Sequence, residues 1–530
     1  MALAARPPGV ATAEQVARAS RSRLRGWEIG ALVAVLGASA MVRLVRLDLA
    51  QVGYDESAAA SLVQAWKVDG QFPLTGIVSS VGIPNPPAWP YVLALAIGPL
   101  DSAYALVVEG VACSLLAIGL TWWIARRWLG AWGGLAATCF YAFGFWAMLL
   151  GRSAWQPAFL QVPVLLCLDG LLMLGARRRP WALALACGWL GLMVQLHYVA
   201  VGYALMLPLA AWPARRALRW RHLGVAVLAG ALPLAPFLMY EAHPAVAASD
   251  VRFLFGQASG GSRLDASAWN LLWNLAGNGG VAGLGGAETS GLQAALGRWV
   301  VLGRIGELLL AAGLVLGVLE GVAGRLVAAW VLLPAVFLAR HSLDVLFHYL
   351  YLDLPAMALA VGMLGAWSVR QRLWARAGVA AALGLYAAVS LATLGVVLAF
   401  VDSHDVYLGY GMPLRYSLAA AQAARAAARP GGLVLVGGPR FQTQVLRFAL
   451  GEGVASESFE ACGLPSAAAD DVLLLLDEAS AAGEALRAQG VPLLARVARP
   501  GGTYAVFGGA AVAPVACATA SEPPRASSTG

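Results

Sequence analysis

Apolar runs about as long as a bilayer is thick alternate with short polar segments along most of the chain. A helix needs about 20 mostly apolar residues to cross the hydrocarbon core of a membrane. Eleven runs meet this requirement and leave the arginine clusters on one side; they lie near residues 28–47, 104–125, 131–150, 156–175, 181–197, 199–213, 222–240, 301–319, 326–340, 346–367 and 376–400. The pattern predicts an all-α polytopic membrane protein with about 11 transmembrane helices over residues 28–400.

One further apolar run, at residues 86–100, does not fit this scheme. It is only about 15 residues long, is rich in proline and is followed by Asp101. If it crossed the membrane, every later loop would change sides and the arginine clusters would face outward, against the positive-inside rule. We therefore interpret it as an interfacial or re-entrant helix.

Basic residues gather at one set of helix ends, which the positive-inside rule assigns to the cytoplasm. They include the clusters at 21–25, 126–127, 177–179, 215–221 and 370–376. This predicts a multi-pass protein of the cell (plasma) membrane with a disordered cytoplasmic N-terminus, residues 1–27. A first outer loop (48–103) and a long outer loop (241–300) then lie outside the cytoplasm. The long loop would be either a mobile lid over a cavity or disordered.

The pattern changes after residue 400. Short β-type runs at 431–438, 470–480 and 492–509 follow a helical segment at 417–430. We predict a small extracytoplasmic α/β domain over residues 401–515 and a disordered tail over 516–530. One glycine pair at 437–438 is too little for a nucleotide-binding fingerprint.

Composition agrees with a membrane protein and limits the partners. The 530 residues are 60% hydrophobic and 12% charged, with a mean hydropathy of +0.71. The net charge is +8, but the arginines lie in clusters that set topology, so we expect membrane lipid and no nucleic acid as a partner. The cysteines lack metal-ligand spacing, and His341 and His348 are seven residues apart rather than three or four. A divalent metal stays open as a cofactor without support from ligand spacing; no other cofactor is predicted.

Two adjacent acids, Asp55 and Glu56, follow the first apolar run. A carboxylate in a half-dry site can act as a general base on an attacking hydroxyl group. Acids are also favoured in the first turn of any helix, because they interact well with the helix dipole. The residues alone leave both interpretations open, and Asp55 and Glu56 are our candidate catalytic residues.

Further candidates are the polar and aromatic side chains that the topology places at outer helix ends. Arginine can bind phosphate through paired N–H donors, tryptophan can stack on a sugar or anchor at the interface, and a histidine at this depth needs a hydrogen-bond partner. The candidate substrate-binding residues are Arg43, Arg46, Arg152, Trp155, His197, Tyr198, Arg340 and His348. Interfacial anchoring of Trp155 and a helix–helix hydrogen bond of His197 are the structural alternatives.

The order of a basic first span, the acid pair, a GQFP break at 70–73 and an NPP return at 85–87 resembles the GT-C superfamily of integral membrane glycosyltransferases. The protein O-mannosyltransferase and aminoarabinose-transferase type (glycosyltransferase family 39-like) is the most similar. The resemblance covers about residues 28–400 and is most specific over 43–90. It implies a GT-C-like fold and inverting transfer of a hexosyl or pentosyl group from a polyprenyl-phosphate sugar donor to a hydroxyl group of an unknown extracytoplasmic acceptor.

In that family the first-loop acid is the catalytic base or otherwise essential, and Asp55 is the residue that matches it, with Glu56 beside it. Family members often carry a second acid in the next outer loop. This chain has GRSAWQP there, at 151–157, without a carboxylate, which argues against a two-acid or metal-dependent mechanism.

Two other classes stay open. A lipid-linked-sugar flippase or transporter would use intramembrane charges as a pathway, but it should show paired halves with broken helices, which we do not find in the sequence. A non-catalytic envelope-assembly membrane protein would be inactive in every transfer assay.

Overall fold

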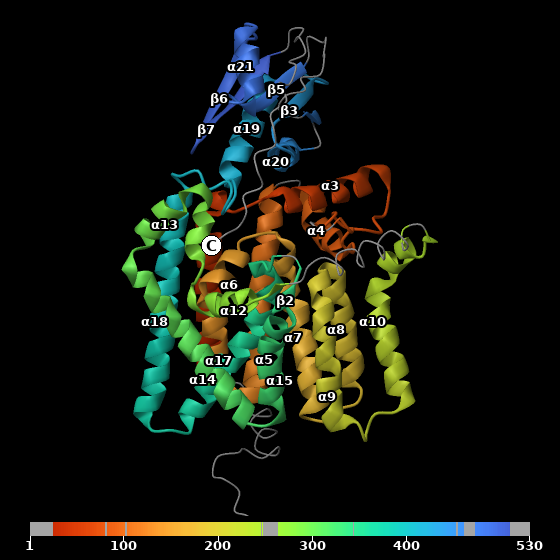
Figure 1. Ribbon diagram of the computed structural model, residues 1–530, viewed down its shortest axis with the longest axis vertical. Coiled ribbons are helices and arrows are strands. Elements are labelled where there is room, and N and C mark those ends of the chain that lie inside the picture. The colour runs from red at the N-terminus through yellow and green to blue at the C-terminus, as the bar shows by residue number, and fades with distance from the viewer. Residues whose placement is uncertain are drawn as a thin grey trace, which may run out of the picture.

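The computed structural model describes residues 25–508 except 80–81, 101–102, 245, 247–262, 343, 452–453 and 460–471. The predicted termini, residues 1–24 and 509–530, lie outside the described residues. A helical bundle carries a small α/β domain at one end (Figure 1). The bundle helices are α2 (Gly26–Leu44), α5 (Ala103–Phe143), α6 (Phe145–Leu150), α7 (Gln156–Gly175), α8 (Ala182–Leu196), α9 (Met206–Ala214), α10 (Trp220–Glu241), α14 (Ile305–Leu319), α15 (Val322–Phe337), α16 (Phe347–Leu350), α17 (Leu354–Val369) and α18 (Leu373–Val401).

Seven helical segments of the described chain are long and apolar enough to cross a membrane: Gly26–Leu44, Ala103–Phe143, Gln156–Gly175, Trp220–Glu241, Arg298–Leu319, Phe347–Val369 and Leu373–Val401. Three shorter apolar helices, Ala182–Leu196, Tyr198–Ala214 and Val322–Phe337, fall on predicted spans as well. This confirms a polytopic helical membrane protein, whereas the count of eleven crossings stays a prediction.

The 41 residues of α5 form two antiparallel helices rather than one long span. The break is Gly130, whose φ of 78° lies in the left-handed region that glycine adopts without steric cost. Beyond it, Gly134 packs against the backbone of Arg126, and Gly151 packs against Ser114. The side-chain-free backbones at these glycines allow the two halves to approach closely, so two of the predicted spans lie in this hairpin.

Two helices lie across the end of the bundle beneath the α/β domain instead of entering it (Figure 1). They are α3 (Tyr54–Asp69) and α4 (Ala88–Leu100). The 13 residues of α4 cover about 20 Å at 1.5 Å per residue, which is less than the hydrocarbon thickness. That length agrees with our interpretation of residues 86–100 as an interfacial or re-entrant helix.

The described part of the long loop after α10 is helical. The elements around it are β1 (Arg263–Leu264), α12 (Ser267–Gly277), η3 (Val281–Glu288), α13 (Thr289–Leu296) and η4 (Arg298–Arg304). The Trp146 indole N–H donates to the backbone oxygens of Asn274 and Gly279, both at 3.2 Å, and so ties this segment to the bundle. Residues 263–300 are therefore largely helical, with backbone hydrogen bonds within the helices and contacts to the bundle, while the mobile-lid interpretation of the 241–300 loop stays a prediction.

A five-stranded sheet forms the α/β domain and confirms the predicted α/β fold of this region, while its bounds and its extracytoplasmic side stay predictions. The strands are β3 (Leu433–Gly437), β4 (Ala455–Phe459), β5 (Val472–Asp477), β6 (Leu493–Arg499) and β7 (Gly502–Gly508), in the order β4-β3-β5-β7-β6. The first three are parallel, and β6 and β7 are antiparallel. Helices α19 (Leu414–Ala427), α20 (Arg440–Leu450) and α21 (Ala481–Ala488) complete the domain.

Hydrogen bonds join this domain to the segment that leads into α3. That segment contains η1 (Leu47–Leu49). The Tyr410 hydroxyl donates to the Leu49 carbonyl at 2.8 Å, and the Leu414 amide donates to the Ala50 carbonyl at 3.0 Å. In α20, the Gln444 side-chain amide donates to Ser61 of α3 at 2.9 Å. The α/β domain is thus hydrogen-bonded both to the segment before α3 and to the middle of α3.

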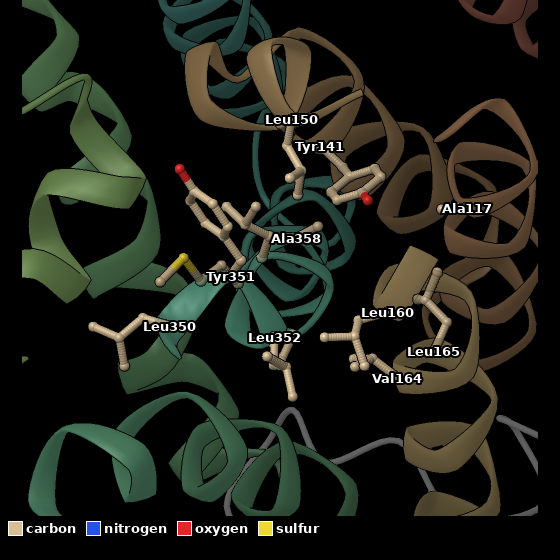
Figure 2. Close-up of a cluster of buried hydrophobic side chains, with 14 of the residues drawn as sticks. Ala117, Tyr141, Leu150, Leu160, Val164, Leu165, Leu350, Tyr351, Leu352 and Ala358 are labelled. Atoms are coloured by element: carbon tan, nitrogen blue, oxygen red, sulfur yellow. The ribbon is translucent and has the colours of Figure 1, made fainter. Parts of the chain in front are cut away.

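The bundle core is built from small and branched apolar side chains of α5, α7 and α17 (Figure 2). Leu160, Val164 and Leu165 of α7 are fully buried there, together with Ala358 of α17. Short helical turns, η2 (Tyr198–Leu205) and η5 (Tyr351–Asp353), and the paired β1 and β2 (Arg340–His341) connect the helices near the α3 end. The core thus forms a rigid base under the polar side chains described next.

Candidate functional site

The acid pair lies in the first turn of α3. Gly53 is the N-cap residue, and its amide donates to the Glu56 carboxylate at 2.9 Å, which is the half of a capping box that a glycine N-cap can make. Glu56 is 4% exposed, so this contact is shielded from water. Glu56 therefore matches the structural alternative for the acid pair, in which an acid stabilises the first turn of a helix.

Burial changes how the Glu56 carboxyl titrates. Desolvation and then the neighbouring Asp55 charge raise the pKa of Glu56 to about 7, while the amide hydrogen bonds at the cap oppose the change. Asp55 is half-buried, and burial also raises its pKa, but the indole N–H of Trp155 donates to its carboxylate at 3.2 Å and lowers it again. Burial therefore raises the pKa of both carboxyls, and for Asp55 the Trp155 indole opposes this effect.

Trp155 brings the acid of the first loop against the start of α7, although 100 residues separate the two in sequence. It is the N-cap residue of α7, which begins at Gln156 with proline in its first turn. The proline restricts the backbone of this first turn and so limits where the Trp155 indole can lie. The Trp155 ring then meets the His348 imidazole edge-on, with 5.1 Å between centroids.

Two histidines and two tyrosines pack on the Trp155 indole or on one another next to it. The His348 ring lies 5.6 Å from the His197 ring and 4.3 Å from the Tyr349 ring, and His197 and Tyr349 are 6.2 Å apart. Tyr351 packs on Trp155 at 6.3 Å. We call Asp55, Trp155, His197, His348 and Tyr349 the acid–histidine cluster. Four separate regions of the chain thus meet at one end of the bundle: α3, the start of α7, the turn between α8 and η2, and α16.

The two buried arginines near this cluster bind the protein itself. The Arg43 guanidinium is completely buried and donates to Ser114 at 2.9 Å and to the carbonyls of Ala142 at 3.1 Å and Ala147 at 3.3 Å. It joins α2 to the α5 hairpin and α6. A buried charge with this many donors satisfied is typical of a structural arginine.

Arg152 satisfies the end of α2. Its guanidinium donates to the carbonyls of Val42, Arg43, Val45 and Arg46 at 2.6 to 3.0 Å. These carbonyls have no partner within the helix, and a cation at a helix C-terminus is also favoured by the dipole. The sequence offered Arg43 and Arg152 as phosphate ligands; the structure uses their N–H groups for packing and does not place them in the cluster.

Arg46 belongs to a half-exposed network at the junction with the α/β domain. It pairs with Asp48 at 3.3 Å and with Asp402 at 2.8 Å, and Arg415 pairs with the same two acids. These contacts join the end of α2 to the start of α19. The structure therefore also places Arg46 at a domain junction rather than in the acid–histidine cluster.

Tyr198 and Arg340 are also near the α3 end of the bundle. The Tyr198 hydroxyl donates to the Pro84 carbonyl at 2.5 Å and so ties η2 to the loop between α3 and α4. Arg340 is exposed in β2, where it pairs with Leu264.

Sequence reasoning missed Tyr349 as a site residue. A small apolar pocket has Tyr349 as one wall, with Val199, Gly202, Tyr203, Leu333, Pro334, Phe337 and Leu338 as the others. The signal was present in the stretch HYLYLD at 348–353, where aromatic and polar residues alternate just before an apolar helix. Among the described residues no group of three His, Cys, Asp or Glu side chains could hold a metal ion.

No family model and no curated protein matches this sequence. Solved structures with a similar fold do match it. The crystal structure of ArnT from Cupriavidus metallidurans bound to undecaprenyl phosphate matches with a TM-score of 0.56 and 15% identity, over 91% of this chain and 99% of that one. The apo structure of the same protein matches with a TM-score of 0.55 and 15% identity, over 90% and 98%. The chain thus has an ArnT-like fold, in agreement with the fold class expected from its sequence.

Proposed function

We propose that this chain is a membrane glycosyltransferase that moves a sugar from a polyprenyl-phosphate donor to a hydroxyl group of an acceptor outside the cytoplasm. The observation that carries the proposal is the position of Asp55, half-buried and hydrogen-bonded to Trp155 at the end of the bundle. The fold match, to an ArnT structure that holds undecaprenyl phosphate, supports the class of donor.

Asp55 is the general base in this proposal. It removes the proton of the acceptor hydroxyl as that oxygen attacks the anomeric carbon. The bond from that carbon to the phosphate oxygen breaks, its electron pair stays with the phosphate, and the carrier leaves as polyprenyl phosphate. Attack from the face opposite the leaving group inverts the anomeric configuration. Trp155 keeps Asp55 ionised and oriented, and its indole offers a flat apolar face for the sugar.

The remaining parts of the proposal concern orientation. The arginine clusters at 126–127, 177–179 and 215–221 support a cytoplasmic N-terminus, and in this proposal α3 and the α/β domain lie outside the cytoplasm. A carrier lipid has its phosphate at the membrane surface and its tail among the lipids. A site at the end of the bundle is where phosphate and acceptor can meet.

The test is sugar transfer from labelled polyprenyl-phosphate donors, in membranes that contain equal amounts of wild type, Asp55→Asn or Asp69→Asn. Asp69 is an exposed acid at the other end of α3, so it controls for loss of charge on the same helix. We expect transfer by the wild type and Asp69→Asn, and at least about a hundredfold loss in Asp55→Asn, as for removal of a general base. Equal transfer by Asp55→Asn would exclude Asp55 as base, and no transfer by any of the three would favour the flippase or assembly classes.

A further inference from the structure

Two turns at the end of the bundle opposite α3 carry a dense group of arginines (Figure 1). One turn joins α7 to α8, and the other joins α9 to α10. Residues 170–240, which contain both turns, include no aspartate or glutamate. We call these arginines the basic face: Arg177, Arg178, Arg179, Arg215, Arg216, Arg219 and Arg221. Their charges have no counter-charge in the segment that carries them.

Helix packing holds the two turns next to each other. Gly175, at the end of α7, packs against Ala210 of α9, and Gly188 of α8 packs against Ala229 of α10. Because α7 and α9 end here and α8 and α10 begin here, four helix ends lie together. The backbone dipoles at the starts of α8 and α10 add to the positive potential of the arginines.

Other arginines at this end of the bundle are neutralised within the protein. Arg127 pairs with Asp169 at 3.0 Å, and Arg126 and Arg370 each pair with a glutamate. Within the described chain no acid forms an ion pair with an arginine of the basic face. The basic face is therefore available to an anion that comes from outside the chain.

The α7–α8 turn has a fixed shape. The Arg177 guanidinium lies over the Trp128 ring, 4.3 Å from its centroid, and the Arg179 amide donates to the Met173 carbonyl at 3.1 Å. Between them Arg178 has a φ of 51°, in the left-handed region that few residues other than glycine adopt. Arg178 and Arg179 are exposed. The turn thus presents two guanidinium groups on a backbone that is already ordered.

The charges of this turn also act on one another. Burial, and then the nearby Arg127 and Arg179 charges, lower the pKa of the Arg177 guanidinium, while Asp169 opposes this effect. Like charges that are held this close favour the binding of an anion, because the anion reduces their mutual repulsion.

Exposed apolar side chains next to the basic face indicate what kind of anion it fits. The indoles of Trp181, Trp212 and Trp220 are 52%, 67% and 87% exposed, and tryptophan favours the headgroup region of a membrane. Further along α10, Val227 and Leu228 are 69% and 70% exposed. A ligand here meets guanidinium groups, then indoles, then an apolar helix face. A phospholipid has the same order of phosphate, interface and acyl chain.

We propose that the basic face is a binding site for the headgroup of an anionic phospholipid, whose acyl chains lie along α10. Arginine binds phosphate through paired N–H donors, and guanidinium groups on two adjacent turns can hold one phosphodiester from both sides. This inference goes beyond the proposed function. It assigns a second ligand site, at the other end of the bundle from Asp55, and it does not depend on sugar transfer.

The experiment measures the affinity of the purified full-length protein, in detergent, for phosphatidylglycerol that carries a fluorescent label on one acyl chain. Wild type is compared with two double variants, one for each turn: Arg178→Gln with Arg179→Gln, and Arg216→Gln with Arg219→Gln. Labelled phosphatidylcholine, which has the same phosphate but no net charge, is measured in parallel. The melting temperature of each variant without added phospholipid shows whether it is folded.

A matched control removes two exposed arginines outside the basic face. These are Arg298 and Arg304 of η4, both changed to glutamine, so every variant loses two positive charges. Inorganic phosphate, added in excess as a competitor, distinguishes a lipid site from a site for any free phosphate.

We expect the wild type and the η4 control to bind phosphatidylglycerol more tightly than phosphatidylcholine. Each turn variant should bind phosphatidylglycerol at least about tenfold more weakly, because two arginines near an anionic headgroup are lost. Added salt should weaken binding by the wild type, and inorganic phosphate should not displace the lipid. Equal affinity of all four proteins for phosphatidylglycerol, or equal affinity of the wild type for both lipids, would overturn the site. Displacement by inorganic phosphate would overturn its assignment to a lipid.

Discussion

Replacing Trp155 by phenylalanine should raise the pH at which the enzyme becomes active. The indole N–H donates to the Asp55 carboxylate at 3.2 Å, and this bond lowers the pKa of Asp55 against the effect of burial. Phenylalanine keeps an aromatic ring beside His348 but has no donor. The ionised form of Asp55 then loses its partner, and a higher pH is needed to populate it.

The size of the change follows from the contact. A hydrogen bond to a charged group contributes about 1.5 to 3 kcal/mol, and bonds of this kind are usually about 2.7 to 2.9 Å long. At 3.2 Å and with Asp55 half-buried, the lower value applies. One pKa unit corresponds to about 1.4 kcal/mol, so the acidic limb of the rate profile should move upward by about one pH unit.

The assay is the initial rate of sugar transfer at saturating donor between pH 4 and 8, for wild type and Trp155→Phe. Rates should converge at high pH, where Asp55 is ionised in both proteins. Trp181, an exposed indole at the start of α8, provides the control as Trp181→Phe, which should leave the limb in place. An acidic limb that stays unchanged or moves to lower pH in Trp155→Phe would refute the role of this hydrogen bond.

Two further predictions concern stability. Because burial and the Asp55 charge raise the pKa of Glu56 to about 7, the folded protein binds this proton more tightly than the unfolded chain, and stability falls as pH rises from about 4.5 to about 7. Glu56→Gln should remove this fall, which is about 3 kcal/mol, and thermal unfolding curves with the wild-type pH dependence would contradict it. Arg152→Ala removes a side-chain donor from four carbonyls at the end of α2, of which the Arg46 carbonyl keeps the Leu49 amide, and should cost about 3 kcal/mol. Arg152→Lys should not restore the loss, because one ammonium cannot reach all four; a wild-type melting temperature in either arginine variant would contradict this account.

The fold was largely predictable because its signals are local. The length of an apolar run decides whether a helix can cross a bilayer, and the runs in residues 28–400 coincide with helices of the structure. The α/β domain was predictable for the same reason, since short alternating runs and glycine-containing turns mark strands. The helical form of residues 263–300 was not predictable from the sequence. Its helices are stabilised by contacts with the bundle, such as that of Trp146, rather than by their own sequence.

The candidate site was predictable only in part. Asp55 could be singled out because a charge beside a membrane span is costly, but nothing local points to Trp155 as its partner 100 residues away. The arginines show the limit most clearly. A guanidinium binds a backbone carbonyl as readily as a phosphate, and which of them it meets depends on helix packing that the sequence does not state.

The distribution of positive charge has a consequence for the chemistry. Arg43 and Arg152 are held by carbonyls of the bundle, so they neutralise the ends and turns of helices instead of the acid pair. Had either guanidinium faced Asp55, it would have lowered the pKa of that carboxyl and made it a weaker base. Desolvation acts on Asp55 with only an indole N–H against it, which keeps its pKa above the usual range and makes it a better proton acceptor. The rate of transfer is therefore expected to rise with pH as Asp55 loses its proton, and Asp55→Asn should remove that rise together with the activity.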